Sequence, residues 1–407
     1  MPSEKPFNGF PVSVLPLFGL SLLALLGSGL ASGQIPPAIF SLSSSPFLCG
    51  LWFGLAVVGM GLCPGPKERG FLVFLCAGSE ALRVYQDWQP AFIGVLAFTG
   101  PRCALVALVH GLISAIFRPH LRRRLRLGLA HSLTLPFLYL AGDTLLSLYA
   151  KKAGLTYDLF YYAADLTLGP PWCFQVVSWT HQSFAFYVLG NLAYFFLSHI
   201  MAFTSAIWIL RPKGPNPNLY FFVCAVICGN VGYLLMSGVG PEVVFQGRFP
   251  FDPPTSVPLQ MILVPANYPR NTMPSLHLLW AYSIWIALAV QGAYWFRASL
   301  TYLVVMPVVA FLGRHYLVDY IPSLCVAPAL HLGVIALTYR NRPPLLLAGM
   351  AALGLIFAPA YFCFVVFGSS IWQVWPWLLK MCTVGLAVLA VFSGCRLKQY
   401  LQNLTDP

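Results

Sequence analysis

The chain has 407 residues, of which 58% are hydrophobic and only 8% are charged, and its formal net charge is +12. In a soluble domain about a quarter of the residues are charged. This chain has too few charged residues for its whole surface to face water. Apolar runs of about 18 to 25 residues recur along the chain, and each is long enough to cross about 30 Å of hydrocarbon. We therefore predict a polytopic membrane protein.

Eleven segments fit a membrane span by length and composition. They cover residues 12–31, 47–63, 91–116, 128–150, 183–210, 219–239, 276–292, 299–313, 316–339, 345–367 and 371–394. The first is expected to be an anchor and not a signal peptide, because its apolar run is long and another span follows. A twelfth at 70–88 is interrupted by Glu80, Arg83 and Asp87. It is included because twelve spans allow both termini to lie in the cytoplasm.

The basic residues lie mainly in the loops that this topology places in the cytoplasm, such as Arg118 and the run from Arg122 to Arg126. This is the positive-inside distribution, so the net charge indicates membrane orientation and not nucleic-acid binding. The eleven cysteines fall mostly inside apolar spans and include no CxxC pair. We expect them to be small buried hydrophobes, and we expect no metal and no cofactor.

Two long loops are predicted on the extracytoplasmic side, at residues 151–182 and 240–275. The first contains YDLFYYAADL, with Asp158 and Asp165 among aromatic residues. It fits an interfacial helix with an aromatic belt, and the alternative is a lid that contacts substrate. The second is rich in Pro and Gly and is predicted to be an irregular ordered loop.

Two short strings concentrate the polar chemistry, MPSLH ending at His277 and GRHYLVD containing His315 and Asp319. Each string begins a predicted span, and one out-and-back hairpin brings both to the same membrane face. Asp319 follows His315 by four residues, so on a helix its carboxylate would share a face with the imidazole. That arrangement would hold one ring nitrogen and leave the other nucleophilic.

Groups suited to a phosphate surround these strings. Arg270, Asn271, Ser275 and Arg314 supply hydrogen-bond donors or positive charge, and neither arginine is expected to be buried against lipid. The first backbone N–H groups of both helices also favour phosphate. We expect His315 to attack a phosphoryl group and His277 to protonate the departing oxygen. The predicted partners are a lipid-phosphate substrate and the bilayer.

The strings RNTMPSLH and HYLVD resemble the type-2 phosphatidic acid phosphatase superfamily, over about residues 128–339. The resemblance implies that His315 is the nucleophile, Asp319 orients it and His277 is the general acid. The phosphatase branch usually has Gly where this chain has Leu276, and Arg where this chain has Val309. Its early Lys-to-Arg-Pro motif is not found in this sequence. These departures are closer to the inositol phosphorylceramide synthase branch, which implies transfer to a lipid hydroxyl.

The resulting fold prediction is an all-α membrane bundle of about ten to twelve transmembrane helices around a six-helix core. We assign residues 1–127 to accessory helices, 128–342 to the catalytic core and 343–407 to a C-terminal helix pair with a short cytoplasmic tail. The expected activity is phosphotransfer on the extracytoplasmic face. Three alternatives stay open: a phosphatase releasing free phosphate, a multi-span transporter and a structural membrane scaffold.

Overall fold

The computed structural model describes residues 51, 54–59, 66–87, 101–118, 122–151, 153–210, 217–310, 314–339 and 343–405. Nearly all of this part of the chain is helical or irregular loop. Its single sheet has two strands, in which β1 (Gly154–Thr156) pairs antiparallel with β2 (Ile262–Val264). The prediction of an all-α fold is confirmed.

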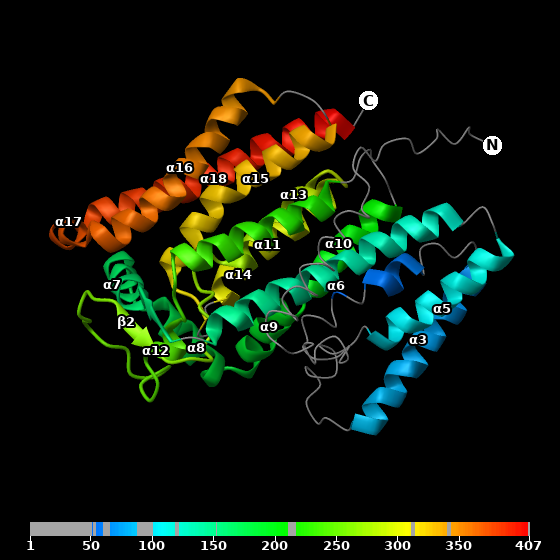
Figure 1. The fold of residues 1–407 in the computed structure, drawn as a ribbon, viewed down its shortest axis with the longest axis horizontal. Coiled ribbons are helices and arrows are strands. Elements are labelled where there is room, and N and C mark those ends of the chain that lie inside the picture. Colours follow the sequence, from blue (N-terminus) through cyan, green and yellow to red (C-terminus); the bar gives the residue numbers. More distant parts are fainter. Residues whose placement is uncertain are drawn as a thin grey trace.

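The helices run along one another over most of the length of the molecule (Figure 1). In chain order they are α3 (Pro66–Asp87), α5 (Pro101–Phe117), α6 (Arg122–Ala150), α7 (Asp158–Leu168), α8 (Trp172–Gln182), α9 (Phe184–Phe195), α10 (Leu197–Leu210), α11 (Asn218–Leu235), α12 (Pro241–Val244), α13 (Leu276–Ala289), α14 (Ala293–Ala310), the short 3₁₀ helix η3 (Leu317–Asp319), α15 (Tyr320–Tyr339), α16 (Leu345–Phe367), α17 (Ser369–Val374) and α18 (Pro376–Thr405).

Four of the described segments are long and apolar enough to cross a membrane. They are Asn218–Leu235, Leu317–Tyr339, Leu345–Phe367 and Pro376–Leu404, and shorter apolar helices occur at Pro101–Ser114, Leu197–Trp208 and Leu276–Ala289. The prediction of a polytopic membrane bundle is therefore confirmed. The predicted span 12–31, and most of 47–63, lie outside the described residues.

Two predicted spans are interrupted in the structure. The segment 183–210 forms two helices, α9 and α10, which meet at Phe196. The segment 371–394 begins within α17, which ends at Val374, and continues in α18 from Pro376. The second break has a local cause, because proline has no N–H to donate and disfavours the helical conformation of the residue before it.

The centre of the bundle is α13, whose residues from Leu278 to Ala289 are all buried. It packs against α10, α11, α14, α15 and α18, and α15 in turn packs against α16 and α18. A helix that is apolar all round belongs in such a central position. At one end of the bundle, α7, α8, α12 and β2 form a layer of loops and short helices (Figure 1).

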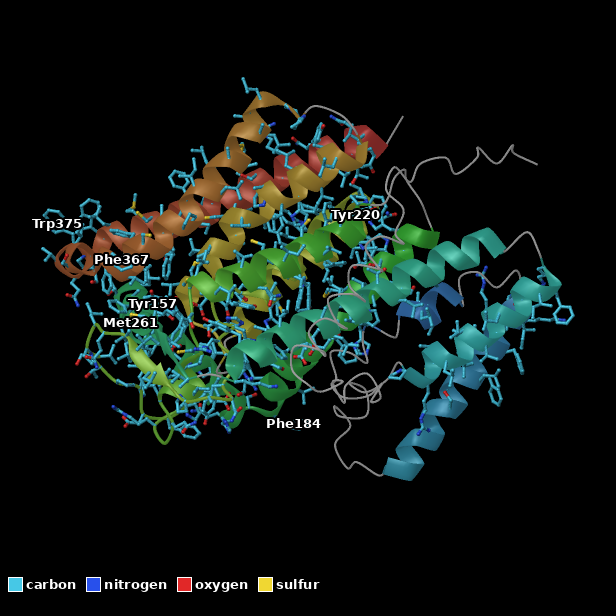
Figure 2. All side chains as sticks on the ribbon, in the orientation of Figure 1. Tyr157, Phe184, Tyr220, Met261, Phe367 and Trp375 are labelled. Atoms are coloured by element: carbon cyan, nitrogen blue, oxygen red, sulfur yellow. The ribbon has the colours of Figure 1, made fainter. Side chains whose placement is uncertain are left out.

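Exposed aromatic side chains mark this end of the molecule. Phe367, Trp375 and Phe251 are exposed, and Figure 2 places Phe367 and Trp375 at the same end as Tyr157 and Met261 of the loop layer. Exposed aromatic rings are typical of the membrane–water interface. This is consistent with the loop layer lying at one surface of the bilayer.

Residues 70–87 of the doubtful twelfth segment, 70–88, lie in the continuous helix α3, and residue 88 lies outside the described residues. Glu68 in the first turn of α3 pairs with His110 of α5 and with Arg118 directly after α5, since its Oε1 lies 2.9 Å from both His110 Nε2 and Arg118 Nη1. These contacts join α3 and α5 into a helix pair that is set apart from the central bundle (Figure 1).

Candidate active site

His277 is fixed by the local structure at the start of α13. Ser275 is the N-cap residue, and its hydroxyl accepts the N–H of Leu278 at 3.5 Å. The Ser275 N–H donates to the Asp319 carbonyl at 3.4 Å, and the hydroxyl of Ser323 donates to the Ser275 carbonyl at 3.1 Å. The start of α13 is thereby tied to the start of α15, so the two predicted strings are held together.

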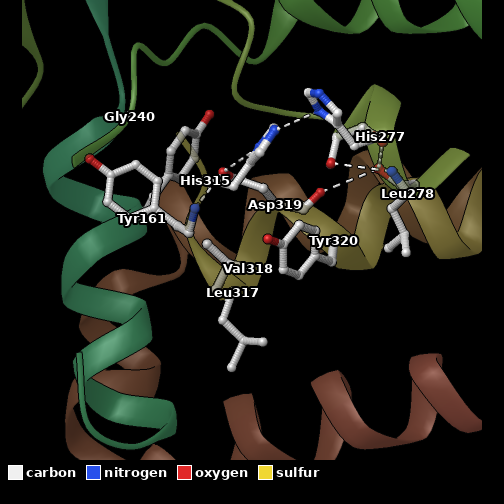
Figure 3. A network of polar contacts seen from close by, with 12 residues as sticks. Tyr161, Gly240, His277, Leu278, His315, Leu317, Val318, Asp319 and Tyr320 are labelled. Atoms are coloured by element: carbon white, nitrogen blue, oxygen red, sulfur yellow. Dashed lines mark hydrogen bonds and ion pairs between the residues drawn. The ribbon is translucent and has the colours of Figure 1, made fainter. Parts of the chain in front are cut away.

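The three predicted catalytic side chains form a row (Figure 3). His315 Nε2 lies 3.3 Å from His277 Nδ1, and His315 Nδ1 lies 3.5 Å from Asp319 Oδ2. His315 and Asp319 are buried, whereas His277 is partly exposed. The distance to Asp319 is longer than a normal hydrogen bond, and such contacts are often loose before substrate binds.

The sequence correctly placed Asp319 near His315, but the expected geometry was wrong. His315 precedes η3 outside any helix, the intervening Tyr316 is extended, and His315 does not share an α-helix with Asp319. The carboxylate folds back instead, and its Oδ2 accepts the N–H of Tyr316 at 2.8 Å. The His315–Asp319 proximity is therefore produced by a capping turn and not by the helical i, i+4 spacing.

Asp165 of α7 holds the same turn from outside. Its Oδ2 accepts the N–H of Leu317 at 2.7 Å, and its Oδ1 accepts the N–H of Val318 at 3.0 Å. Burial raises the pKa of this carboxyl well above its usual value, and the two donated bonds oppose the rise. These backbone donors were expected to bind phosphate, and the structure corrects that expectation because Asp165 already occupies them.

Asp158, the first residue of the same helix, holds a second loop. Its carboxylate accepts the N–H of Val239 at 3.1 Å and the N–H of Gly240 at 2.8 Å. Burial raises its pKa, and hydrogen bonds with Thr156 and with these backbone groups act against the rise. Through Asp158 and Asp165, α7 connects the loop after α11 to the turn that carries His315.

The environment of His315 favours its neutral form. Burial lowers the pKa of this imidazole from 6.5 to about 4, a backbone hydrogen bond with Thr272 acts in the opposite direction, and the charge of Arg314 lowers the pKa further. A neutral ring has a lone pair on one nitrogen. At pH 7 His315 is thus in the protonation state that a nucleophile requires.

The two candidate phosphate-binding arginines have different surroundings. Arg314 is 60% exposed, and its Nε lies 3.5 Å from Glu242 Oε2. Arg270 is only 5% exposed, and it is buried among protein groups. The Arg270 guanidinium donates to the Tyr149 carbonyl and lies 4.1 Å from the centre of the Tyr149 ring. It therefore supports the end of α6, while its role toward phosphate stays a prediction.

Ser275 and Asn271 are the remaining residues that were predicted to bind substrate. Ser275 acts as a helix cap and is fully buried, and Asn271 lies partly exposed beside Arg270. One neighbour of the site was missed, because Tyr194 of α9 stacks on His277 with ring centroids 4.7 Å apart and planes at 29°. No signal in the sequence distinguishes Tyr194 from the other aromatic residues of its apolar segment.

Comparison with known proteins agrees with this geometry. Residues 160–333 match the family model of the PAP2 superfamily, and this segment contains most of α7, both histidines and Asp319. The match supports the superfamily and, with it, a lipid phosphatase or phosphotransferase type of function. The chain has no significant match among curated proteins and none among solved structures.

Proposed function

We propose that the protein transfers a phosphate-bearing group from a membrane lipid through a phosphohistidine formed on His315. The observation that carries this proposal is the row of Asp319, His315 and His277, which are separated by 3.5 and 3.3 Å. The match of residues 160–333 to the PAP2 superfamily supports the same class of reaction.

In the first step, the Nε2 lone pair of His315 bonds to phosphorus while the bond from phosphorus to the lipid oxygen breaks. A protonated His277 gives its proton to that oxygen. In the second step a hydroxyl oxygen attacks phosphorus, the N–P bond breaks, and His277 takes the proton of the attacking group. Asp319 holds the Nδ1 proton of His315 throughout and so keeps Nε2 reactive.

Substrate binding must separate the two histidines. Attacking and leaving atoms lie roughly in line across phosphorus, so the acid has to stand on the far side from the nucleophile. The rings of His277 and His315 meet edge to face, with 3.3 Å between their nearest nitrogens. His277 is partly exposed, and it is therefore the ring that we expect to move.

We favour a lipid or alcohol hydroxyl over water as the second nucleophile, in a reaction like that of inositol phosphorylceramide synthase. The support is the resemblance of PSLH and HYLVD to that branch. We place the reaction on the extracytoplasmic face, with both termini in the cytoplasm. Residues 1–127 and 343–407 are proposed as accessory helices beside the core.

The test uses purified protein in vesicles and a lipid radiolabelled in its phosphate. Wild type should accumulate acid-labile, base-stable label, and His315→Ala should not. Products are then resolved as free phosphate or a new phospholipid, which separates phosphatase from transferase. If unchanged lipid moves between leaflets and neither product forms, the transporter alternative replaces the enzyme.

A further inference from the structure

A cavity of about 530 Å³ lies between the ends of α6 and α11. Its apolar walls include Leu145 and Leu146 of α6 and Leu234 of α11, and its polar groups include Asn230 and Arg270. Leu145 and Leu234 are 48% and 60% exposed. Because α11 is long and apolar enough to span a membrane, this cavity is a groove that opens sideways toward lipid.

The polar end of the groove is a fixed positive charge. The Arg270 guanidinium donates to the carbonyl of Tyr149 and lies over the Tyr149 ring. On its other side it packs so closely on Gly154 that an added Cβ there would overlap the guanidinium. A guanidinium at the end of an apolar groove complements a ligand with an anionic end and a hydrocarbon chain.

The groove adjoins the candidate active site through α11. Tyr233 lines the groove and hydrogen-bonds with the backbone of Leu276, the residue before His277. On the neighbouring face of α11, Gly232 packs against Pro274, since an added Cβ would lie 2.2 Å from Pro274 Cδ. The groove and the turn that carries His277 therefore meet at the same end of α11.

We propose that this groove binds the acyl chain of the lipid-phosphate substrate, with the anionic end of the lipid directed toward Arg270 and the catalytic turn. The inference rests on the proposed function and deepens it. It assigns Arg270 to substrate binding, whereas His315 and His277 perform the chemistry. A substrate without a long chain would then reach the histidines without using the groove.

Leu146→Trp tests the proposal by filling the groove. The KM for dioleoyl phosphatidic acid should rise about tenfold, the effect of losing roughly two buried methylene groups. The KM for para-nitrophenyl phosphate, which has no acyl chain, should stay unchanged. Val231→Trp is the matched control, because Val231 is 51% exposed on α11 and does not line the groove.

An equal change in KM for both substrates, or no change for either in a folded Leu146→Trp protein, would overturn the proposal. Thermal unfolding in detergent checks folding, and Leu145→Phe replaces Leu146→Trp if that variant does not fold. The smaller Leu145→Phe change should raise the KM for dioleoyl phosphatidic acid in the same selective way.

A binding measurement separates failure of the groove from failure of the enzyme. A phosphatidic acid with a photoreactive diazirine in its acyl chain should cross-link to α6 and α11 peptides, and Leu146→Trp should remove those cross-links. If wild type cross-links there but turns over no lipid phosphate, the proposed function fails and the groove stands. Turnover with cross-links confined to other helices overturns the groove alone.

Discussion

Two partners bracket the imidazole of His315, with His277 near Nε2 and Asp319 near Nδ1. Only one ring nitrogen of a neutral imidazole carries a proton, so the Asp319 side determines which nitrogen is nucleophilic. Removal of either partner should therefore have a different effect from removal of His315.

His315→Ala should abolish turnover of every phosphate substrate, and Asp319→Asn should lower kcat by about four orders of magnitude through the wrong tautomer, as in other His–Asp pairs. His277→Ala should lose the natural lipid but keep activity toward an activated aryl phosphate, whose leaving group needs little protonation. Steady-state kinetics with both substrates measures this. Normal lipid turnover by His315→Ala would contradict the mechanism.

Asp165 should influence turnover although it lies behind the catalytic turn. Asp165→Asn leaves one acceptor oxygen for the two N–H groups of Leu317 and Val318, and a buried donor left without an acceptor costs about 1 to 3 kcal/mol. We expect kcat to fall by about ten- to a hundredfold with little change in KM. Asp252→Asn, at an exposed side chain, is the control.

A purely structural role for Asp165 would give a different result. Asp165→Asn would then lower the thermal unfolding temperature while the folded fraction kept the kcat of wild type. Measuring kcat per folded molecule, with the folded fraction taken from the unfolding curve, distinguishes the two outcomes.

The lowered pKa of His315 predicts a specific pH dependence. The folded-state pKa is about 4 and the unfolded value is about 6.5, so the unfolded state binds more protons between these values. Stability should therefore fall as the pH falls from about 6.5 to about 4. His315→Asn should lose less stability over this window in denaturation measurements at several pH values. An identical loss in both proteins would contradict the lowered pKa.

At the level of elements, the site depends on how closely α11 approaches the start of α13. Gly229 and Gly232 face this contact, and an added Cβ at Gly229 would lie 2.4 Å from Leu276 Cδ2. A methyl group at Gly229 must displace the Leu276 side chain, and one at Gly232 must displace the rigid Pro274 ring and with it the turn that precedes His277.

Gly232→Ala should consequently lower kcat, by about tenfold or more, because a displacement of about 1 Å at a catalytic group is costly. Gly333→Ala in α15 is the matched control. An added Cβ there meets nothing within 4 Å, and alanine favours the helix, so stability and activity should be kept. Equal kcat values for the two variants would show that the α11–α13 contact tolerates movement.

At the level of the whole molecule, the structure separates two ends along the bundle. The loop layer of α7, α8 and α12 lies at one end, and the C-terminal end of α18 lies at the other (Figure 1). The row of histidines begins α13 and precedes α15 at the loop-layer end. The predicted membrane orientation therefore also decides on which side the chemistry occurs.

Single cysteines at Lys151 and Phe251, which are both exposed, should react with a membrane-impermeant maleimide applied to the extracytoplasmic (periplasmic or lumenal) side of sealed membranes. Cysteines placed at residues 122–126 or near Lys398 should react only after permeabilisation, because positively charged loops stay in the cytoplasm. The exposed native Cys363 and Cys382 are first replaced by serine or alanine. Labelling at Phe251 only after permeabilisation would reverse the orientation.

Some features follow from the sequence alone because they depend on composition or on short spacing. A chain with 58% hydrophobic and 8% charged residues must place most of its length in lipid. His277 and His315 each lie at the start of a predicted membrane span, on the same membrane face. Asp319 is near enough in sequence to reach His315 in a helix or in a turn. These local relations allowed both the membrane fold and the catalytic candidates to be predicted.

The tertiary structure decided the contacts between segments far apart in the chain. Asp165 holds the turn at Leu317 across 152 residues of sequence, and Tyr194 reaches His277 from a different helix. Arg270, seven residues before His277, turns to Tyr149 at the end of α6. Local sequence carries no signal for such pairings, because each depends on how whole helices pack and on which buried backbone donors still require an acceptor.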